Sequence, residues 1–283
     1  MGEKTALVVK SNRLIEASYR LTLVEQQLIL FSIVQARSTQ KGLNPADPVT
    51  IRALDFAIQF GTHADNVYRD LKSALETLFK RYVVIHDTNP DTGLPRVTET
   101  RWLSTASYMD GDGSLQLIFA PRVIPFVTRL DKEFTAYRLE KIGNLSSVYA
   151  VRMYELLVQY LKVGKREFGI ENLRGILGLE KEYSEIADFK KFVLDISVKQ
   201  INEFTDITAS YSQRRTGRRV SHFIFTIAAK ADATPKKPKL KKPPSPPEAT
   251  RRPDPTPEER AVGTLKLAEI MDALRQGRPP KID

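Results

Sequence analysis

The sequence predicts an α+β fold in which one pattern, three helices followed by a β-hairpin, occurs twice and precedes a Pro/Lys-rich tail. Apolar residues recur at helical spacing in three segments of each half. After the third helix of each half, alternating apolar residues flank turn signals, as is typical of hairpins. After residue 230 the composition changes to Pro, Lys and few large apolar residues.

The expected elements of the first copy lie within residues 1–130. In order they are a helix at 21–37, a short strand and a helix within 49–61, a helix at 66–81, and strands at 82–88, 101–109 and 114–120. Thr22 and Glu25 have the spacing of a capping box, which predicts where the first helix begins. Trp102 and Tyr19 are expected in the core, as most aromatic side chains are.

The second copy occupies residues 131–230. In order we expect helices at 144–162, 168–179 and 187–204 and strands at 205–212 and 220–228. Asp188 is the expected cap of the third helix. A step of 100° per residue along that helix places Phe189, Val193 and Ile196 in the core.

This order of elements is that of the winged helix-turn-helix, in which the third helix enters a DNA groove and the hairpin forms the wing. We therefore predict two tandem winged-helix domains, at 1–130 and 131–230, followed by residues 231–283.

The tail is expected to be a disordered linker that ends in a short amphipathic helix. The linker cannot bury enough apolar surface to offset its ordering entropy. Thr256 and Gly277 are suitable helix ends, and Leu267, Ile270 and Leu274 fall on one stripe between them. Such a helix either docks on a partner or folds back and frays, and the sequence leaves both alternatives open.

The charge balance indicates a polyanionic partner. The chain has 44 Lys and Arg residues against 34 Asp and Glu residues, a net charge of +10. Nucleic acid is the first candidate and an anionic membrane surface the second. The chain contains no cysteine, which excludes disulfides and thiolate metal sites and fits a reducing cytoplasm. Because no signal peptide or 18-residue apolar window is present, we expect a cytoplasmic protein with no membrane partner.

Motifs for catalysis are missing from the sequence. There is no GxxxxGK[ST] phosphate loop, no GxSxG elbow and no His-hydrophobe-His pair beside a nucleophilic tyrosine. We therefore expect no enzymatic activity, no catalytic residue, no metal and no cofactor.

DNA-binding candidates are concentrated in the second copy. The third helix carries Lys191, Asp195, Lys199 and Asn202 along one polar stripe. Lysines can contact phosphates or guanine edges, and asparagine can pair with adenine. The alternative for this stripe is an ordinary solvated helix face.

The turn between the two strands carries four arginines, namely Arg214, Arg215, Arg218 and Arg219. Arginines at a wing tip can bind phosphates or enter a narrow minor groove. The alternative is an exposed basic loop without a partner.

The first copy has a thinner basic set, and Glu76 interrupts it. Its members are Arg69, Lys72, Lys80, Arg81 and Arg101. We expect weaker or less specific DNA contacts there, or a function divided with subunit contacts.

Four segments of the body resemble the Rep type 3 family of plasmid replication initiators. They are residues 8–37, 66–81, 188–207 and 214–227, so the resemblance covers most of residues 8–228 and leaves out the tail. It implies tandem winged-helix domains that bind iteron repeats in a plasmid origin as a monomer and repress the initiator's own operator as a homodimer. The resemblance further implies that the N-terminal domain dimerises and contacts the DNA backbone, and that the C-terminal domain binds a specific sequence. It also implies melting of an AT-rich region, recruitment of the host initiator ATPase and replicative helicase, and no catalytic site.

Two sets of residues take the family's DNA-binding roles in this sequence. The recognition-helix role falls on Lys190, Lys191, Asp195 and Lys199, and the wing role on Arg214, Arg215, Arg218 and Arg219. The alternatives are a winged-helix transcriptional regulator without an initiator role and a DNA-nicking enzyme. Direct repeats beside AT-rich DNA would favour an initiator, whereas a lone palindrome would favour a regulator.

Overall fold

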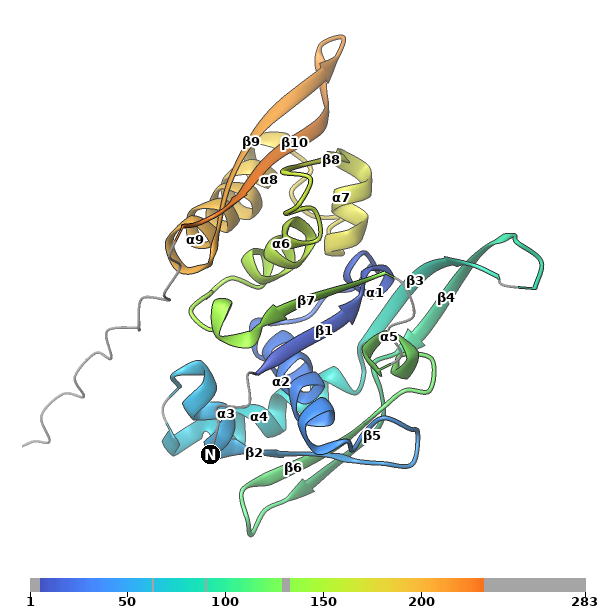
Figure 1. The fold of residues 1–283 in the computed structure, drawn as a ribbon, viewed down its shortest axis with the longest axis vertical. Helices are drawn as coiled ribbons and strands as arrows, with labels where there is room; N and C mark the ends of the chain where they lie inside the picture. The colour runs from blue at the N-terminus through green and yellow to red at the C-terminus, as the bar shows by residue number, and fades with distance from the viewer. Residues whose placement is uncertain (1–5, 63, 90, 129–132, 232–283) are drawn as a thin grey trace, which may run out of the picture. The chain divides into compact units, whose positions relative to one another are not determined.

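The computed structural model describes residues 6–62, 64–89, 91–128 and 133–231 (Figure 1). The predicted linker and terminal helix lie, from residue 232 onward, outside the described residues. Within the described ranges, no helix has the length and apolar character needed to cross a membrane.

The first half of the described chain surrounds a long central helix, α2. Its elements are β1 (Leu7–Ser11), α1 (Asn12–Ile15), α2 (Leu23–Thr39), β2 (Val49–Arg52), α3 (Ala53–Phe60), α4 (Ala64–Leu78), β3 (Tyr82–Thr88), β4 (Pro95–Arg101), β5 (Leu103–Met109), β6 (Ser114–Phe119), α5 (Ile124–Thr128), β7 (Phe134–Arg138) and the 3₁₀ turn Leu139–Lys141. The predicted capping box starts α2, because Thr22 Oγ1 accepts from the Glu25 amide at 3.2 Å and the Glu25 carboxylate accepts from the Thr22 amide at 2.6 Å. Eleven of the seventeen residues of α2 are buried, which places this helix in the core of the first half.

The strand predicted at 101–109 is divided at Trp102. Arg101 is the last residue of β4, and Leu103–Met109 form β5. Between the two strands, the indole of Trp102 is fully buried against Tyr19, with ring centroids 4.9 Å apart. The predicted core positions of both aromatic residues are confirmed. Strand β4 pairs with β3 in a two-stranded hairpin, and β2, β6 and β5 form a separate three-stranded antiparallel sheet. The sequence analysis missed β4 because its apolar residues are few and its flank is rich in turn residues.

Strands β1 and β7 form a further two-stranded sheet, which the sequence analysis did not predict. The strands pair antiparallel, with Val9 opposite Ala136. They come from opposite sides of the boundary predicted between residues 130 and 131, so both ends of the first 140 residues meet in one sheet.

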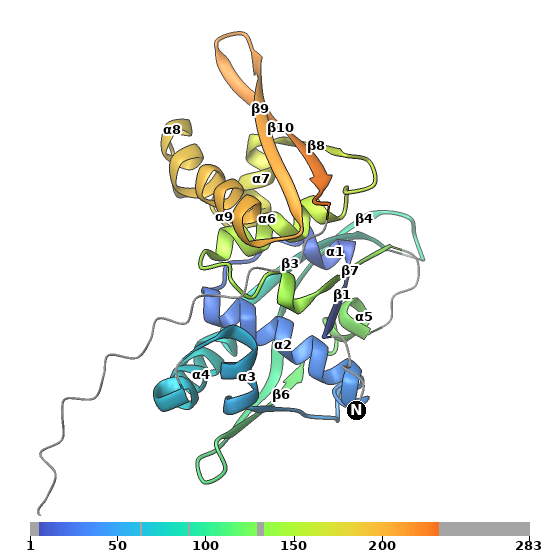
Figure 2. The ribbon, with the colours of Figure 1, turned by 60° about the vertical axis from the view of Figure 1, so that its left-hand side comes forward.

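The second half contains three helices and a three-stranded sheet. Its elements are α6 (Val148–Val158), β8 (Lys165–Gly169), α7 (Ile170–Leu177), α8 (Ile186–Phe189), the π-helical segment η2 (Lys190–Asp195), α9 (Ile196–Phe204), β9 (Ile207–Thr216) and β10 (Arg219–Ala229). The sheet order is β8-β10-β9, with both pairs antiparallel. Figure 2 shows the hairpin of β9 and β10 extending beyond the helices of this half.

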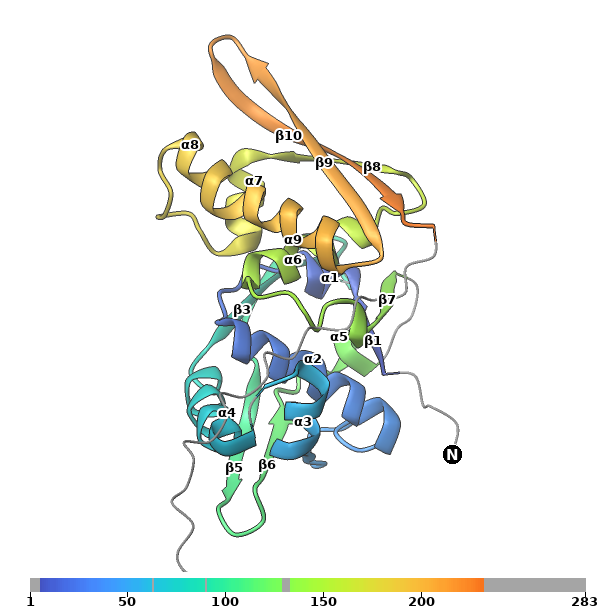
Figure 3. The ribbon, with the colours of Figure 1, turned by 90° about the vertical axis from the view of Figure 1, so that its left-hand side faces the viewer.

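Helices α8 and α9 and the π segment form one continuous helix, and the sequence analysis was wrong about it in two details (Figure 3). Its N-cap is Glu185 and not Asp188, and no side chain caps it. Ile196 is not in the core but is 37% exposed, and Ser197 is fully buried in its place. The π segment adds a residue to one turn, so the buried face is shifted by one position after it.

A buried ionic network attaches α6 to the first half. The Glu155 carboxylate is fully buried and accepts hydrogen bonds from Lys10 at 2.9 Å, Tyr137 at 2.8 Å and Gln26 at 3.3 Å. These partners come from β1, β7 and α2. Apolar spacing alone gave no sign of this network, because Glu155 lies within an otherwise ordinary helical pattern.

Arg152, one turn before Glu155, connects α6 to α7. Its guanidinium lies 3.6 Å from the centroid of the Tyr19 ring and donates to the carbonyls of Ile15, Ala17 and Ile176 at 2.9–3.0 Å. Both terminal nitrogens of the Arg152 guanidinium are therefore hydrogen-bonded.

Candidate nucleic-acid interface

The turn between α7 and α8 fixes where the third helix of the second half begins. Helix α7 ends at Gly178, whose φ of 67° is left-handed. A Cβ at this position would lie 3.1 Å from the Tyr19 carbonyl oxygen, a tight contact, so space as well as conformation favours glycine. The nearly buried guanidinium of Arg174 then donates to the carbonyls of Glu182, Tyr183 and Ser184, which orders the turn that leads into α8.

The inner face of the third helix is apolar and closely packed. The side chains that are fully buried on this face are Phe189, Val193, Leu194, Ser197 and Ile201. Ser197 satisfies its hydroxyl by donating to the carbonyl of Val193, one turn earlier. Because this face is anchored, the opposite face has a defined orientation toward solvent.

The outer face carries most of the predicted polar stripe. Lys191, Asp195 and Lys199 are exposed, and Lys190 is half-buried at the edge of the face. Asp195 is not free, because its carboxylate accepts a hydrogen bond of 2.6 Å from Tyr211 on β9. Burial, and to a smaller extent this bond, raise the pKa of the Tyr211 hydroxyl well above its usual value of 10.

Asn202 has a different position from the other members of the stripe. Its amide nitrogen donates to the Ala209 carbonyl at 2.8 Å, and its amide oxygen accepts from the Ala209 amide at 2.7 Å. The side chain thus joins the end of the helix to the start of β9, and pairing with adenine would require both bonds to break.

The hairpin places all four predicted arginines at its tip. Thr216 pairs with Arg219, so Gly217 and Arg218 form a two-residue turn, and Gly217 has the positive φ of 62° that such turns need. The strands therefore extend through Arg214 and Arg215, which point to opposite faces because side chains alternate along a strand. A bulge at Ser221 shifts the register between Val220 and His222.

The four arginines differ in their partners. Arg214 is paired with Glu167 of β8 at 2.7 Å. Arg215, Arg218 and Arg219 are exposed, and within the described part of the chain no carboxylate lies within salt-bridge distance of them. Three fixed cations thus remain available at the hairpin tip.

The basic residues predicted in the first half are mostly engaged with neighbouring acids. Lys72 contacts Asp110 at 3.0 Å, Arg69 contacts Asp70 at 3.3 Å and Arg81 contacts Glu25 at 3.1 Å. These contacts reduce the cationic character of this half.

Two further basic residues of the first half have other surroundings. Lys80 is exposed but lies beyond the end of α4 at Leu78. The guanidinium of Arg101 lies 5.5 Å from the rings of both Phe79 and Tyr82.

Asp110 is also the acceptor of a tyrosine. Tyr68 donates to it at 2.7 Å, and this bond and the Lys72 ammonium lower the pKa of Asp110. The same bond raises the pKa of Tyr68 to about 12. The β5–β6 turn is thereby attached to α4, which gives Lys72 a structural contact.

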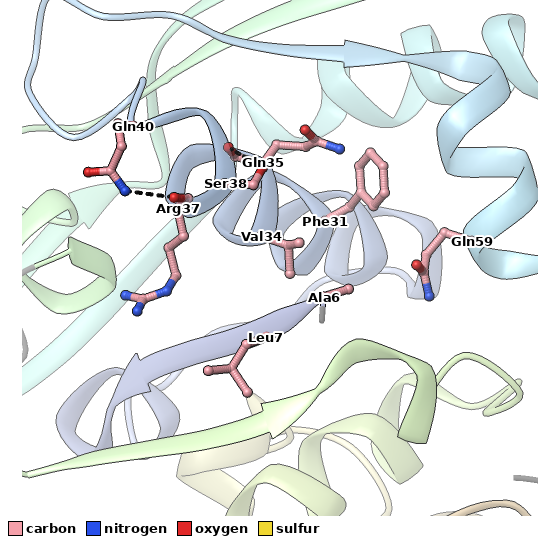
Figure 4. A pocket seen from close by; sticks show the side chains of 9 residues that line it. All are labelled: Ala6, Leu7, Phe31, Val34, Gln35, Arg37, Ser38, Gln40 and Gln59. Atoms are coloured by element: carbon pink, nitrogen blue, oxygen red, sulfur yellow. Dashed lines mark hydrogen bonds between the residues drawn. The ribbon is translucent and has the colours of Figure 1, made fainter. Parts of the chain in front are cut away.

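A cavity in the first half has no set of side chains suited to catalysis. Figure 4 shows a cavity of about 710 Å³ beside α2, with side chains from α2, α3 and β1 at its walls. Arg37 is the one ionisable side chain among the nine residues that line it. Among the described residues, no group of three or more His, Cys, Asp or Glu side chains could hold a metal ion.

Comparisons with known proteins identify the two halves. Residues 7–158 match the family described as "Initiator Replication protein, WH1", and residues 169–227 match the family described as "Initiator Rep protein, WH2". The chain is 26% identical to a replication initiation protein of Escherichia coli over 228 residues, which is 78% of this chain and 69% of that protein. It is also 26% identical over 237 residues to an uncharacterized 27.6 kDa protein of Escherichia coli, covering 80% of this chain and 96% of the relative.

One solved structure has the same fold. The Pi initiator protein, crystallised in complex with iteron DNA, matches with a TM-score of 0.65 and 19% identity over 82% of this chain and 100% of that one. The two family matches together cover most of the described residues, and the element order is that of two tandem winged helices. The resemblance noted in the sequence is therefore confirmed, and the chain belongs to the Rep type 3 family of initiator replication proteins.

Proposed function

We propose that this chain initiates plasmid replication by binding repeated sequences, iterons, in double-stranded origin DNA. The observation that supports this most directly is the combination of two surfaces within the WH2 domain. One is the outer face of the continuous helix from α8 to α9, with Lys191 and Lys199 exposed. The other is the hairpin tip, with three arginines that have no acidic partner among the described residues.

The two surfaces suit different parts of a duplex. A helix of this width fits the major groove, where lysine can donate to guanine and contact phosphates. The charged side chains of the hairpin tip, residues 214–219, are all arginines, which suits the phosphate backbone or the adjacent minor groove. The Pi initiator, whose fold is similar, was crystallised with iteron DNA, and this supports the same class of ligand here.

The first domain has a smaller part in this proposal. Because most of its predicted cations are paired with acids, we expect WH1 to add weak backbone contacts and to provide the contacts between subunits of a homodimer. Dimers would repress the operator of the initiator's own gene. Bound monomers would open an AT-rich segment and recruit the host initiator ATPase and replicative helicase.

Footprinting of the DNA upstream of the chain's own gene tests this proposal. We expect protection of several direct repeats beside an AT-rich stretch, together with a separate protected operator. Protection of a single palindrome and nothing else would instead support a transcriptional regulator. Cleavage of supercoiled origin DNA on addition of a divalent metal would support a nicking enzyme and contradict the proposal.

Lys199→Ala is the matching test of the recognition helix. If Lys199 contacts a base, the variant should change the preference among iteron variants by about 1–3 kcal/mol. An equal loss of affinity on every sequence would identify a phosphate contact. Lys165 is an exposed lysine at the start of β8, and Lys165→Ala serves as the control. This variant should leave the preference among iteron variants unchanged.

A further inference from the structure

Two large apolar side chains lie on the outer face of the third helix of WH2. Phe192 is 42% exposed and Ile196 is 37% exposed, although both are surrounded by polar and charged positions. They are four residues apart across the π segment, which puts them on the same side of the helix. An unbroken α-helix would have placed Ile196 in the core. The π segment thus exposes apolar surface that an ordinary helix would bury.

The ring of Phe192 is held in place by its neighbours. Its centroid lies 6.1 Å from that of the Tyr183 ring, and the Lys191 ammonium lies 5.0 Å from it. Tyr183 itself has a φ of 50°, which is unfavourable for a residue with a bulky side chain. The buried Arg174 stabilises that backbone by binding the Tyr183 carbonyl. A side chain fixed in this way loses little entropy when it meets a partner.

The surroundings indicate what the partner is. Lys191 and Lys199 lie on the same face, and the unpaired arginines of the hairpin belong to the same domain. A partner must therefore offer negative charge together with small apolar groups. The major groove of DNA offers both, because the 5-methyl group of each thymine projects into it between two rows of phosphates.

We propose that Phe192 and Ile196 contact thymine 5-methyl groups in the major groove and so determine which positions of the bound sequence must be A·T pairs. This inference rests on the proposed function and assigns a specificity role to two residues outside the polar stripe. Burial of one methyl group corresponds to about 0.8 kcal/mol, or about a fourfold change in affinity. The contribution comes from the methyl group itself and not from base pairing.

Deoxyuridine substitution tests the inference directly. The probe is the duplex that the wild-type full-length chain enriches most strongly from a random-sequence pool. Each thymine of that duplex is replaced in turn by deoxyuridine, which removes the 5-methyl group and keeps the base pair. We expect wild-type affinity to fall about fourfold at one or two positions. Phe192→Ala or Ile196→Ala should bind the all-thymine duplex more weakly and should no longer distinguish thymine from deoxyuridine at its position.

Two further variants make the result specific. Phe192→Leu keeps an apolar side chain and should retain part of the methyl discrimination. Val163→Ala removes an apolar side chain that is 71% exposed in the loop before β8, and it should keep the full wild-type profile. Thermal unfolding of each variant establishes that the domain is folded.

Several outcomes would overturn the inference. One is a wild-type chain that selects a sequence but is insensitive to every deoxyuridine. Another is full sensitivity retained in both alanine variants. A third is a change in self-association on Phe192→Ala with an unchanged deoxyuridine profile, which would identify a subunit contact. Failure of the wild-type chain to enrich any sequence would instead contradict the proposed function as well.

Discussion

The hydroxyl of Tyr211 on β9 donates a 2.6 Å hydrogen bond to the carboxylate of Asp195 on the third helix of WH2. The bond connects the base of the hairpin to the last residue of the π segment. It also occupies the carboxylate that lies between Lys191 and Lys199 on the outer face. The two surfaces proposed to contact DNA are therefore joined by a side-chain bond as well as by the chain between them.

Tyr211→Phe removes this bond without removing the ring. Hydrogen bonds to charged groups contribute about 1.5–3 kcal/mol when well buried. Tyr211 is half-buried, so we expect the free energy of unfolding to fall by about 1 kcal/mol, measured by urea denaturation. Ser212→Ala, at the next and exposed position, should have no such effect. A double-mutant cycle with Asp195→Ala that shows no coupling would contradict a direct contribution from the bond.

Tyrosine ionisation predicts the alkaline limit of stability. Burial and then Asp206 raise the pKa of Tyr154, whose hydroxyl donates to that carboxylate at 2.9 Å. Burial and a bond to Tyr183 raise the pKa of Tyr149 to about 12. Because both pKa values exceed the usual 10 of an unfolded chain, the stabilisation is complete below pH 10 and is lost as the pH rises above it. Denaturation at a series of pH values from about 9 to 11 should show this fall.

Tyr154→Phe should make the alkaline fall in stability less steep, since the variant has one fewer tyrosine with a raised pKa. At neutral pH the variant should be less stable by about 1 kcal/mol because the Asp206 carboxylate loses a donor. An alkaline slope equal to that of the wild-type chain would show that other groups determine it.

The four hairpin arginines should not contribute equally to DNA binding. Arg215→Ala, Arg218→Ala and Arg219→Ala should each reduce the slope of log affinity against log salt by about 0.9 if each residue contacts one phosphate. Arg214→Ala should reduce it less, because Arg214 already has Glu167 as a partner at 2.7 Å. The measurement is a binding titration at several salt concentrations. Equal slopes for wild-type and all four variants would rule out phosphate contacts at the tip.

Asn202→Ala should lower stability and leave base preference unchanged. Its amide makes both of its observed hydrogen bonds to the Ala209 backbone, so the variant leaves a buried amide and carbonyl unsatisfied. We expect a loss of about 1–3 kcal/mol in unfolding free energy. Weaker binding that is uniform across sequences would accompany it. A changed preference at an adenine, with normal stability, would instead support the base contact predicted from the sequence.

The ionic network around Glu155 gives a prediction about the core. Lys10→Met leaves the Glu155 carboxylate buried without its main cation, which is expected to cost about 3–5 kcal/mol. The double variant Lys10→Met with Glu155→Leu should recover part of this loss, because the buried carboxylate is then gone. Arg152, which lies 3.9 Å from Glu155, keeps its backbone carbonyl acceptors in that variant. Chemical denaturation of the two variants measures the difference. A double variant less stable than the single one would mean that Tyr137 and Gln26 depend on the carboxylate for their own hydrogen bonds.

The sequence predicted the helices of this protein better than its strands. The Thr22–Glu25 capping box, the helix between Gly169 and Gly178 and the hairpin around Gly217 follow local rules, and all three are present in the structure. Strands β1, β4, β7 and β8 were missed, because each pairs with a strand whose identity no local rule reveals. Three of them have only five residues, and β4 has few apolar residues.

The candidate site was predicted in part, and the reasons for the errors are local. Lys191, Lys199 and the hairpin arginines have the exposure that the helical and alternating patterns predicted. Phe192 and Ile196 were missed because a constant step of 100° cannot represent a turn with an extra residue. The ion pairs of Lys72 and Arg214 depend on residues distant in sequence, so charge counting alone overestimated the free cations.

The π segment also has a consequence for comparing this protein with its relatives. A helix with one residue more than an ordinary turn can return to regular geometry by losing that residue. Deletion of one position between Lys190 and Asp195 would therefore restore an ordinary turn and leave every later side chain, Lys199 included, on its present face. If DNA-contacting positions are numbered from the first residue of this helix, the numbers after Asp195 are therefore one higher than in a regular α-helix. An alignment of this helix with a regular recognition helix needs a one-residue gap at the π segment.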